Sequence, residues 1–279
     1  MKSGNAESGP ALYVAMLSAV AALGGLLFGY DTAVIAGAIG FLRVHFALDA
    51  ASTGWAASSA LLGCLIGAGI AGYTADRIGR KKALLTAAIL YVVSGVWSAL
   101  PSTIAEFSAA RILGGIGIGT ASVVCPLYIA EISPAGRRGR LVTFNQLAIV
   151  IGILVVYFVN YFIAGLGSDS WNASTGWRWM FGSAALPAAV FFFLTLLIPE
   201  SPRWLAEHGK PDEARRTLVR VGGDAMADAD LAAITEALRE EPVSFRLCRP
   251  LISAATCPRS SGWTIRAKSI SSFENSSAR

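Results

Sequence analysis

The sequence is short of charge, histidine and cysteine. Only 15% of its 279 residues are charged and 54% are hydrophobic, which excludes an ordinary soluble domain and predicts several membrane spans. The four cysteines show neither a disulfide framework nor the spacing of metal ligands. The two histidines, His45 and His208, stand alone, without a nucleophile–base pair or a phosphate-binding loop. The sequence therefore offers no support for an enzyme, a metal site or a bound cofactor.

The excess positive charge of the chain lies in its last residues. The net charge is +5, but residues 1–241 hold 17 basic and 17 acidic side chains, whereas residues 242–279 hold six basic and one acidic. This distribution does not indicate a nucleic-acid partner. Residues 242–279 are also rich in serine and lack any helical or alternating period, so we predict a tail that is disordered or the product of a frameshift.

Six apolar runs are long enough to cross a bilayer as helices. The connections after the second and fourth runs carry seven basic residues, and those after the first, third and fifth carry one. This asymmetry predicts that both ends of the six-helix block are cytoplasmic. The first run is too long for the core of a signal peptide, so we interpret it as a retained span. The runs cover residues 11–39, 53–75, 83–100, 104–130, 141–164 and 178–198.

The residues after the last apolar run predict short helices outside the membrane. Pro211 followed by two acidic residues indicates the start of a helix that ends at Gly222, and a second helix is expected over about residues 228–240. The chain therefore divides into four predicted parts. These are a cytoplasmic N-terminus at 1–10, a transmembrane bundle at 11–198, a cytoplasmic helical segment at 199–241 and the tail at 242–279.

Two charged residues fall inside the apolar runs. Asp31 lies within GGLLFGYDTAVIAGA at 24–38, and Arg111 lies near the start of the fourth run. A buried ionisable group inside a membrane is by default a functional-site hypothesis. Because an unpaired buried charge is costlier than a pair, we predict that the two residues are partners. A carboxylate balanced between burial and a neighbouring cation could take up and release protons, and a static structural ion pair is the alternative.

Glycines are placed where helices can approach one another closely. GGLLFG at 24–29 in the first run is echoed by GGIGIG at 114–119 in the fourth, which predicts two sets of three helices in an inverted repeat. A further set in the second run predicts either tight packing or a surface on which helices slide. That set is Gly63, Gly67, Gly69 and Gly72.

Five motifs, in the same order along the chain, resemble the sugar porter family of the major facilitator superfamily, in particular its bacterial D-xylose–proton symporters. The resemblance covers about residues 11–240. The motifs are GGLLFGYDTAVIAGA at 24–38, GYTADRIGRKK at 72–82, RILGGIGIGTASVVCPLYIAEISPAGRRG at 111–139, FNQLAIVIGILVVYFVNY at 144–161 and PESPRWL at 199–205.

The resemblance implies roles for individual residues. Asp31 would be the proton-coupling carboxylate and Arg111 its partner. Phe28 would lie against the sugar and Gln146 would bond to its hydroxyl groups. Some xylose symporters carry a second glutamine at the position of Ile153. Ile153 resembles the facilitative relatives instead, and this difference weakens the case for xylose in particular. The charged residues implied in cytoplasmic gating are Asp76, Arg77, Arg80, Glu131, Arg138, Glu200 and Arg203.

The resemblance also implies a fold and a function. The family has twelve helices in two halves, and this chain matches the N-terminal half. We therefore expect an all-α membrane protein with six transmembrane helices as a 3+3 inverted repeat, plus short cytoplasmic helices, in the inner or plasma membrane. The implied function is proton-coupled symport of a pentose or hexose by alternating access, as half of a transporter.

The implied partners are a monosaccharide, a proton, the lipid bilayer and either a missing C-terminal half or a second copy of the chain. We expect that this chain alone does not concentrate sugar, because most polar contacts to sugar in that fold come from the other half. Two alternatives stay open. One is a truncated, non-transporting membrane remnant or a sugar sensor, and the other is a proton-independent facilitated sugar carrier.

Overall fold

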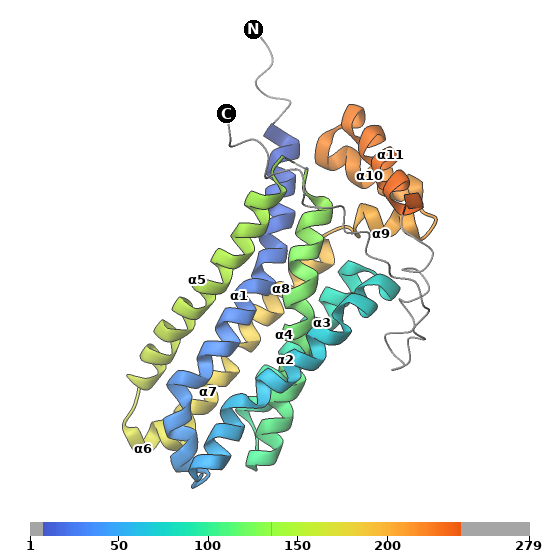
Figure 1. The fold of residues 1–279 in the computed structure, drawn as a ribbon. Coiled ribbons are helices and arrows are strands. Elements are labelled where there is room, and N and C mark those ends of the chain that lie inside the picture. The colour runs from blue at the N-terminus through green and yellow to red at the C-terminus, as the bar shows by residue number, and fades with distance from the viewer. Residues whose placement is uncertain (1–7, 135, 241–279) are drawn as a thin grey trace, which may run out of the picture. The chain divides into compact units, whose positions relative to one another are not determined.

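The computed structural model describes residues 8–134 and 136–240, and every regular element in these ranges is a helix. Six stretches are long and apolar enough to cross a membrane, which confirms the predicted fold class. Five of them contain a single continuous helix, and Figure 1 shows these helices side by side. They are α1 (Ser8–His45), α2 (Ala50–Ile78), α3 (Arg80–Ala99), α4 (Ile104–Ile132) and α5 (Arg138–Ala164).

The sixth span is interrupted. It consists of α6 (Asp169–Trp171), the π-helical turn η1 (Asn172–Gly176), α7 (Trp177–Gly182) and α8 (Ala185–Leu197). The apolar run predicted a start at residue 178, whereas the helical segment begins at Asp169, because polar residues cap and form its first turns. The Ser168 hydroxyl accepts a hydrogen bond from the Trp171 amide, and the Asn172 side-chain amide donates to the Ala164 carbonyl over 2.9 Å.

The helices also extend past the other apolar runs, because capping residues rather than hydrophobicity set where they end. The Asp49 carboxylate accepts a hydrogen bond from the Ser52 amide over 2.8 Å at the start of α2. Thr103 accepts one from the Glu106 amide at the start of α4. Gly79 separates α2 from α3 with φ at +100°, a conformation that favours glycine.

The glycine echo marks a structural repeat. Gly25 and Gly29 of α1 face the backbone of α5, and Gly115 and Gly119 of α4 face the backbone of α2 in the same way. The first helix of each set of three therefore packs against the second helix of the other set. Gly24 faces Phe191 of α8 as well as α4, and Gly114 faces α3. The first helix of each set therefore also contacts the third helix of the other set. The contacts agree with the predicted inverted repeat.

The four glycines of the second run behave differently from one another. A Cβ at Gly63 or Gly67 would lie 2.1 or 2.2 Å from a backbone carbonyl oxygen of α4, whereas a Cβ at Gly69 or Gly72 would meet no atom within 4 Å. Two of the four are therefore packing positions. Without water to drive helix association inside lipid, such close backbone approach is a main source of contact.

Burial differs strongly among the spans. In the most apolar part of α4, 61% of the residues are buried, whereas 17% are buried in the corresponding part of α5. Helix α4 therefore lies at the centre of the bundle, and α5 presents a long apolar face outward. That face includes Phe144, Leu147, Leu154, Phe158 and Phe162.

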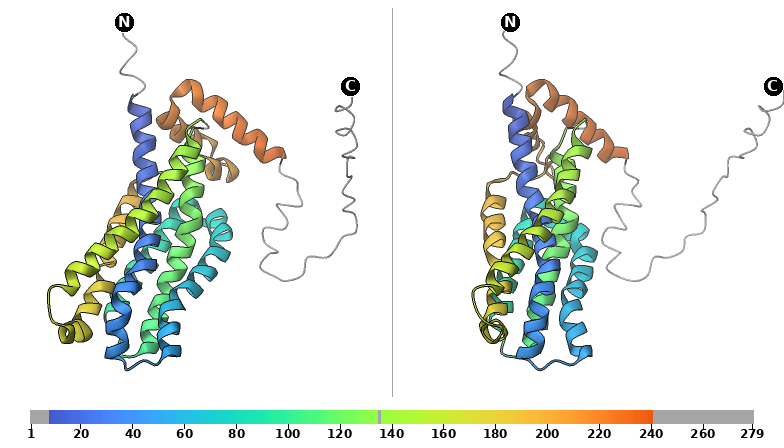
Figure 2. Two further views of the ribbon diagram at one scale, coloured as in Figure 1. Left: turned by 60° about the vertical axis from the view of Figure 1, so that its left-hand side comes forward. Right: turned by 90° about the vertical axis from the view of Figure 1, so that its left-hand side faces the viewer.

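Three short helices follow the sixth span: α9 (Pro202–Glu207), α10 (Pro211–Gly222) and α11 (Asp224–Glu240). They lie at the end of the bundle opposite α6, as Figures 1 and 2 show. The bounds of α10 match the prediction, α11 begins four residues earlier than expected, and α9 was not predicted. The N-terminal residues 1–7 and the tail predicted at 242–279 lie outside the described residues.

Candidate functional site

The two charged residues of the apolar runs form an ion pair in the interior of the bundle. Asp31 of α1 and Arg111 of α4 are each 3% exposed at the side chain, and an Arg111 Nη1 donates to an Asp31 carboxylate oxygen. Arg111 Nη2 also donates to the Asp31 carbonyl over 3.2 Å. The pair joins the first helices of the two repeats. Pairing compensates two charges that would each be unfavourable alone in a low-dielectric interior.

Aromatic side chains surround this pair. The Arg111 guanidinium lies 5.4 Å from the ring centroid of Phe181 of α7, a favourable cation–π geometry. The hydroxyl of Tyr91 of α3 and the Arg111 Nε are buried without a hydrogen-bond partner. Tyr30 precedes Asp31 in the sequence, and its hydroxyl forms a hydrogen bond with the Ser183 hydroxyl over 2.7 Å. The interior thus holds polar groups with spare hydrogen-bonding capacity close to the ion pair.

Phe28 and Gln146 line one open cleft of about 340 Å³ between α1, α4 and α5. The neighbouring Asn145 is 5% exposed, and its carbonyl oxygen Oδ1 has no hydrogen-bond partner. An aromatic face with amide groups beside it suits a polyhydroxylated ligand, because the amides bond to hydroxyls while the ring covers apolar ligand edges. Ile153 does not line this cleft and lies instead where α5 meets Gly29 of α1.

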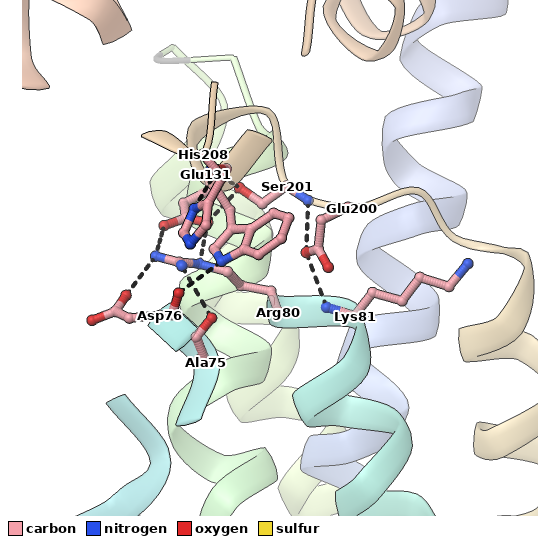
Figure 3. A network of polar contacts seen from close by, with 9 residues as sticks. Ala75, Asp76, Arg80, Lys81, Glu131, Glu200, Ser201 and His208 are labelled. Carbon is pink, nitrogen blue, oxygen red and sulfur yellow. Dashed lines mark hydrogen bonds and ion pairs between the residues drawn. The ribbon is translucent and has the colours of Figure 1, made fainter. Parts of the chain in front are cut away.

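A second charged cluster lies at the end of the bundle that carries α9, and Figure 3 shows it. Arg80, which is 3% exposed, holds Glu131 of α4 in a bidentate pair with two bonds of 2.9 Å. It also pairs with Asp76 over 3.2 Å and donates to the Ala75 carbonyl. We call these four residues the Arg80 cluster. A bidentate arginine–carboxylate pair fixes geometry as well as charge, so the cluster ties α2, α3 and α4 together.

The segment between α8 and α9, together with α9 itself, contacts this cluster and the start of α3. The Ser201 hydroxyl donates to Glu131 over 2.5 Å, and the Trp204 indole donates to the Asp76 carbonyl over 2.8 Å. The Glu200 carboxylate accepts a hydrogen bond from the backbone amide of Lys81 over 3.0 Å (Figure 3). Lys81 lies in the first turn of α3, where the helix dipole favours a negative charge. The chain that leaves the sixth span is thereby fixed to α2, α3 and α4.

The remaining residues implied in gating lie outside the Arg80 cluster. Arg77 donates to the hydroxyl of Tyr73, one turn earlier in α2. Arg138 is exposed, and it lines a hollow of about 390 Å³ together with Arg203 and Glu131. The structure thus brings Asp76, Arg80 and Glu131 together, with Glu200 nearby.

Several residues of these sites escaped prediction as individuals. Ser201 and Trp204 belong to the PESPRWL motif, but only its charged members were singled out, since a hydroxyl and an indole carry no charge pattern. Tyr91 and Phe181 gave no signal, because an aromatic in an apolar run is normally a lipid-facing or core residue. Among the described residues, no group of three or more His, Cys, Asp or Glu is placed to hold a metal ion.

Comparisons with known proteins agree with this arrangement. The sequence model of the sugar (and other) transporter family matches residues 17–257. An arabinose-proton symporter of Bacillus subtilis is 43% identical over 229 residues, which cover 82% of this chain and 49% of that protein. A D-xylose-proton symporter of Escherichia coli is 43% identical over 252 residues, covering 81% of this chain and 51% of that protein.

The solved structures include a strong match. The proton:xylose symporter XylE bound to 6-bromo-6-deoxy-D-glucose superposes with a TM-score of 0.82 at 41% identity, covering 85% of this chain and 56% of that one. The chain thus spans about half the length of the curated relatives it matches. The family match also continues past residue 240 into the segment for which we predicted a disordered or frameshifted tail.

Proposed function

Because this chain belongs to the sugar (and other) transporter family, we propose that it forms the N-terminal half of a proton-coupled monosaccharide transporter. The chain is a multi-pass membrane protein with six candidate spans, and we place it in the cell membrane with both ends of the bundle cytoplasmic. The observation that carries the proposal is the Asp31–Arg111 pair, a titratable carboxylate with a fixed cation inside the membrane span.

The pair suggests how a proton would be coupled to movement. While Asp31 is ionised, Arg111 holds α1 and α4 together. A proton on Asp31 cancels the attraction and leaves Arg111 as an unpaired buried cation, a state that favours rearrangement of the two helices. Because these are the first helices of the two repeats, a change between them affects both sets of three helices. Proton binding would thus shift the population between two arrangements of the bundle.

The cleft lined by Phe28 and Gln146 is the proposed sugar surface of this half. It is open, and the amide of Gln146 can bond to hydroxyl groups. The Arg80 cluster is the proposed cytoplasmic gate, because its bidentate pair with Glu131 is buried and would have to break when that end opens. Alternating access needs two bundles around a central site, so the second half would supply the opposite wall.

The test is gradient-driven uptake in proteoliposomes. We expect this chain alone to show no accumulation of labelled xylose or glucose. Co-reconstituted with the C-terminal half of the E. coli D-xylose-proton symporter, it should accumulate sugar when the outside is acidic. Asp31→Asn should abolish accumulation but retain sugar exchange, since the exchange step needs no net proton movement.

The matched control is Asp49→Asn, which removes a carboxylate outside the spans and leaves a residue that still caps α2. Accumulation by Asp31→Asn at the level of Asp49→Asn would contradict proton coupling and favour a facilitated carrier. Accumulation by this chain alone would contradict its role as a half. A second copy could instead supply the other wall, and a cysteine cross-link at Gln146 would then trap dimers. A chain that neither binds nor exchanges sugar in any pairing would favour the non-transporting remnant.

A further inference from the structure

A second hollow lies at the end of the bundle opposite α9–α11. It measures about 520 Å³ and is formed where the ends of α3 and α5 meet the interrupted sixth span. Its volume falls within the range of ligand pockets, about 300–1,000 Å³. No residue of the sugar cleft, the ion pair or the Arg80 cluster lines it. The lining residues are Val96, Ala99, Leu100, Ile163, Leu166, Thr175, Arg178, Trp179, Gly182 and Ser183.

The walls of this hollow are mostly apolar, with the hydroxyl side chains of Thr175 and Ser183 and one charged group among them. Arg178 of α7 is the only charged residue among them, and it is partly exposed. Its Nη1 donates to the Ala99 carbonyl over 3.0 Å and its Nη2 donates to the Pro101 carbonyl over 3.4 Å. Its guanidinium also lies 4.6 Å from the ring centroid of Trp177.

The charge of Arg178 is not neutralised by the rest of the described chain. No carboxylate in residues 8–134 and 136–240 forms an ion pair with it, in contrast to Arg80 and Arg111. The Ala99 carbonyl is at the C-terminus of α3, where the helix dipole offsets part of the charge, and the Pro101 carbonyl follows two residues later. A guanidinium has five N–H donors, and two of the five are used here, so donors remain for an anion.

The rim of the hollow shows where it lies relative to a bilayer. Leu100, Leu166 and Trp179 line it and are 67%, 76% and 63% exposed. Apolar side chains with this exposure, at the end of long apolar helices, are in contact with acyl chains when the protein is in a membrane. Tryptophan concentrates where the hydrocarbon region meets the headgroups. The hollow therefore opens at headgroup depth, with its apolar walls toward the acyl region and its one cation at the interface.

We propose that this hollow binds one anionic phospholipid of the adjacent leaflet, with its phosphate at Arg178 and an acyl chain against the walls formed by α3, α5 and α7. The alternative is that Arg178 only caps the end of α3 and that the hollow binds the acyl chain of any lipid. The two differ in headgroup dependence, because a cap has no preference for the charge of a lipid. The proposal does not depend on the transport function proposed above.

The experiment is native mass spectrometry of the full chain, released from detergent that contains phosphatidylglycerol or phosphatidylcholine with identical acyl chains. We expect one phosphatidylglycerol to be retained, at least tenfold more than phosphatidylcholine. Arg178→Gln should reduce retention of phosphatidylglycerol to the level of phosphatidylcholine. Val96→Trp should do the same by filling the hollow, and Val96 is 48% exposed, so a larger side chain fits there without disturbing the core.

The matched control is Arg43→Gln, which removes an exposed positive charge at the same end of the bundle and should leave retention unchanged. Equal retention of the two lipids would overturn the proposal. So would unchanged retention in both Arg178→Gln and Val96→Trp, or an equal loss in Arg43→Gln. If Arg178→Gln proves unfolded by circular dichroism, Val96→Trp decides the outcome.

Discussion

Replacing Gly67 by alanine would force the backbones of α2 and α4 apart. The new Cβ would lie 2.2 Å from the Ile116 carbonyl oxygen, and real Cβ atoms essentially never come within 3.0 Å of such an atom. Overpacking of this kind costs about 1–3 kcal/mol. Replacing a glycine by alanine inside a helix also stabilises the helix by about 1 kcal/mol, because alanine has the higher helix propensity, and this gain applies at any position of α2. The gain is the same at Gly69, where a Cβ meets nothing within 4 Å.

Comparison of Gly67→Ala with Gly69→Ala therefore isolates the packing cost, because helix propensity cancels. We expect Gly69→Ala to be as stable as the parent chain or more stable, and Gly67→Ala to be less stable than Gly69→Ala by about 1–3 kcal/mol. The free energy of unfolding can be measured by titration with sodium dodecyl sulfate, followed by circular dichroism. Equal stability of the two variants would refute the reasoning that close backbone contact with α4 holds α2 in place.

Three further outcomes follow from the charged residues. Asp31→Asn leaves Arg111 as an unpaired buried cation and should destabilise the chain by about 3–5 kcal/mol, measured by the same titration; a loss below 1 kcal/mol would contradict a buried pair. Glu131→Ala removes the bidentate partner of Arg80 and the acceptor of the Ser201 hydroxyl. Because Ser201 precedes α9, we expect faster amide hydrogen exchange in α9 of this variant. The Arg215 guanidinium, bonded to Asp228 over 2.7 Å, lowers the pKa of the Asp228 carboxyl below 3.8. The contact between α10 and α11 should therefore be at full strength above pH 3.8 and weaken as the pH falls through the lower folded-state pKa; Asp228→Asn should remove that part of the pH dependence of amide exchange.

The membrane spans and their order could be predicted from sequence because apolar length is a direct requirement of the bilayer. Helix ends were harder to place. His45 ends α1 six residues after the predicted end of the apolar run, because the helix continues through the charged Arg43. The sixth span begins with DSWNASTG, a polar stretch that hydrophobicity cannot identify as helical.

The interior of the site was predictable only where charge made a residue conspicuous. The Asp31–Arg111 contact follows from the cost of an unpaired charge, and the structure places the two side chains together. The position of Ile153 beside Gly29 rather than in the cleft depends on the rotation of α5, which the sequence does not encode in any local pattern. The different environments of Gly67 and Gly69 arise for the same reason, since the facing helix has to be known.

The π-helical turn at Asn172–Gly176 has a consequence for insertions and deletions in this chain. Removal of one residue from an ordinary α-helix turns everything beyond it by about 100°, because 3.6 residues complete a turn. A π turn holds one residue more than an α turn, so loss of the exposed Ser174 can be absorbed by rewinding to α geometry. The sixth span should therefore tolerate a single-residue deletion at this point, with α7 and α8 keeping the faces that they now present to α1 and α3.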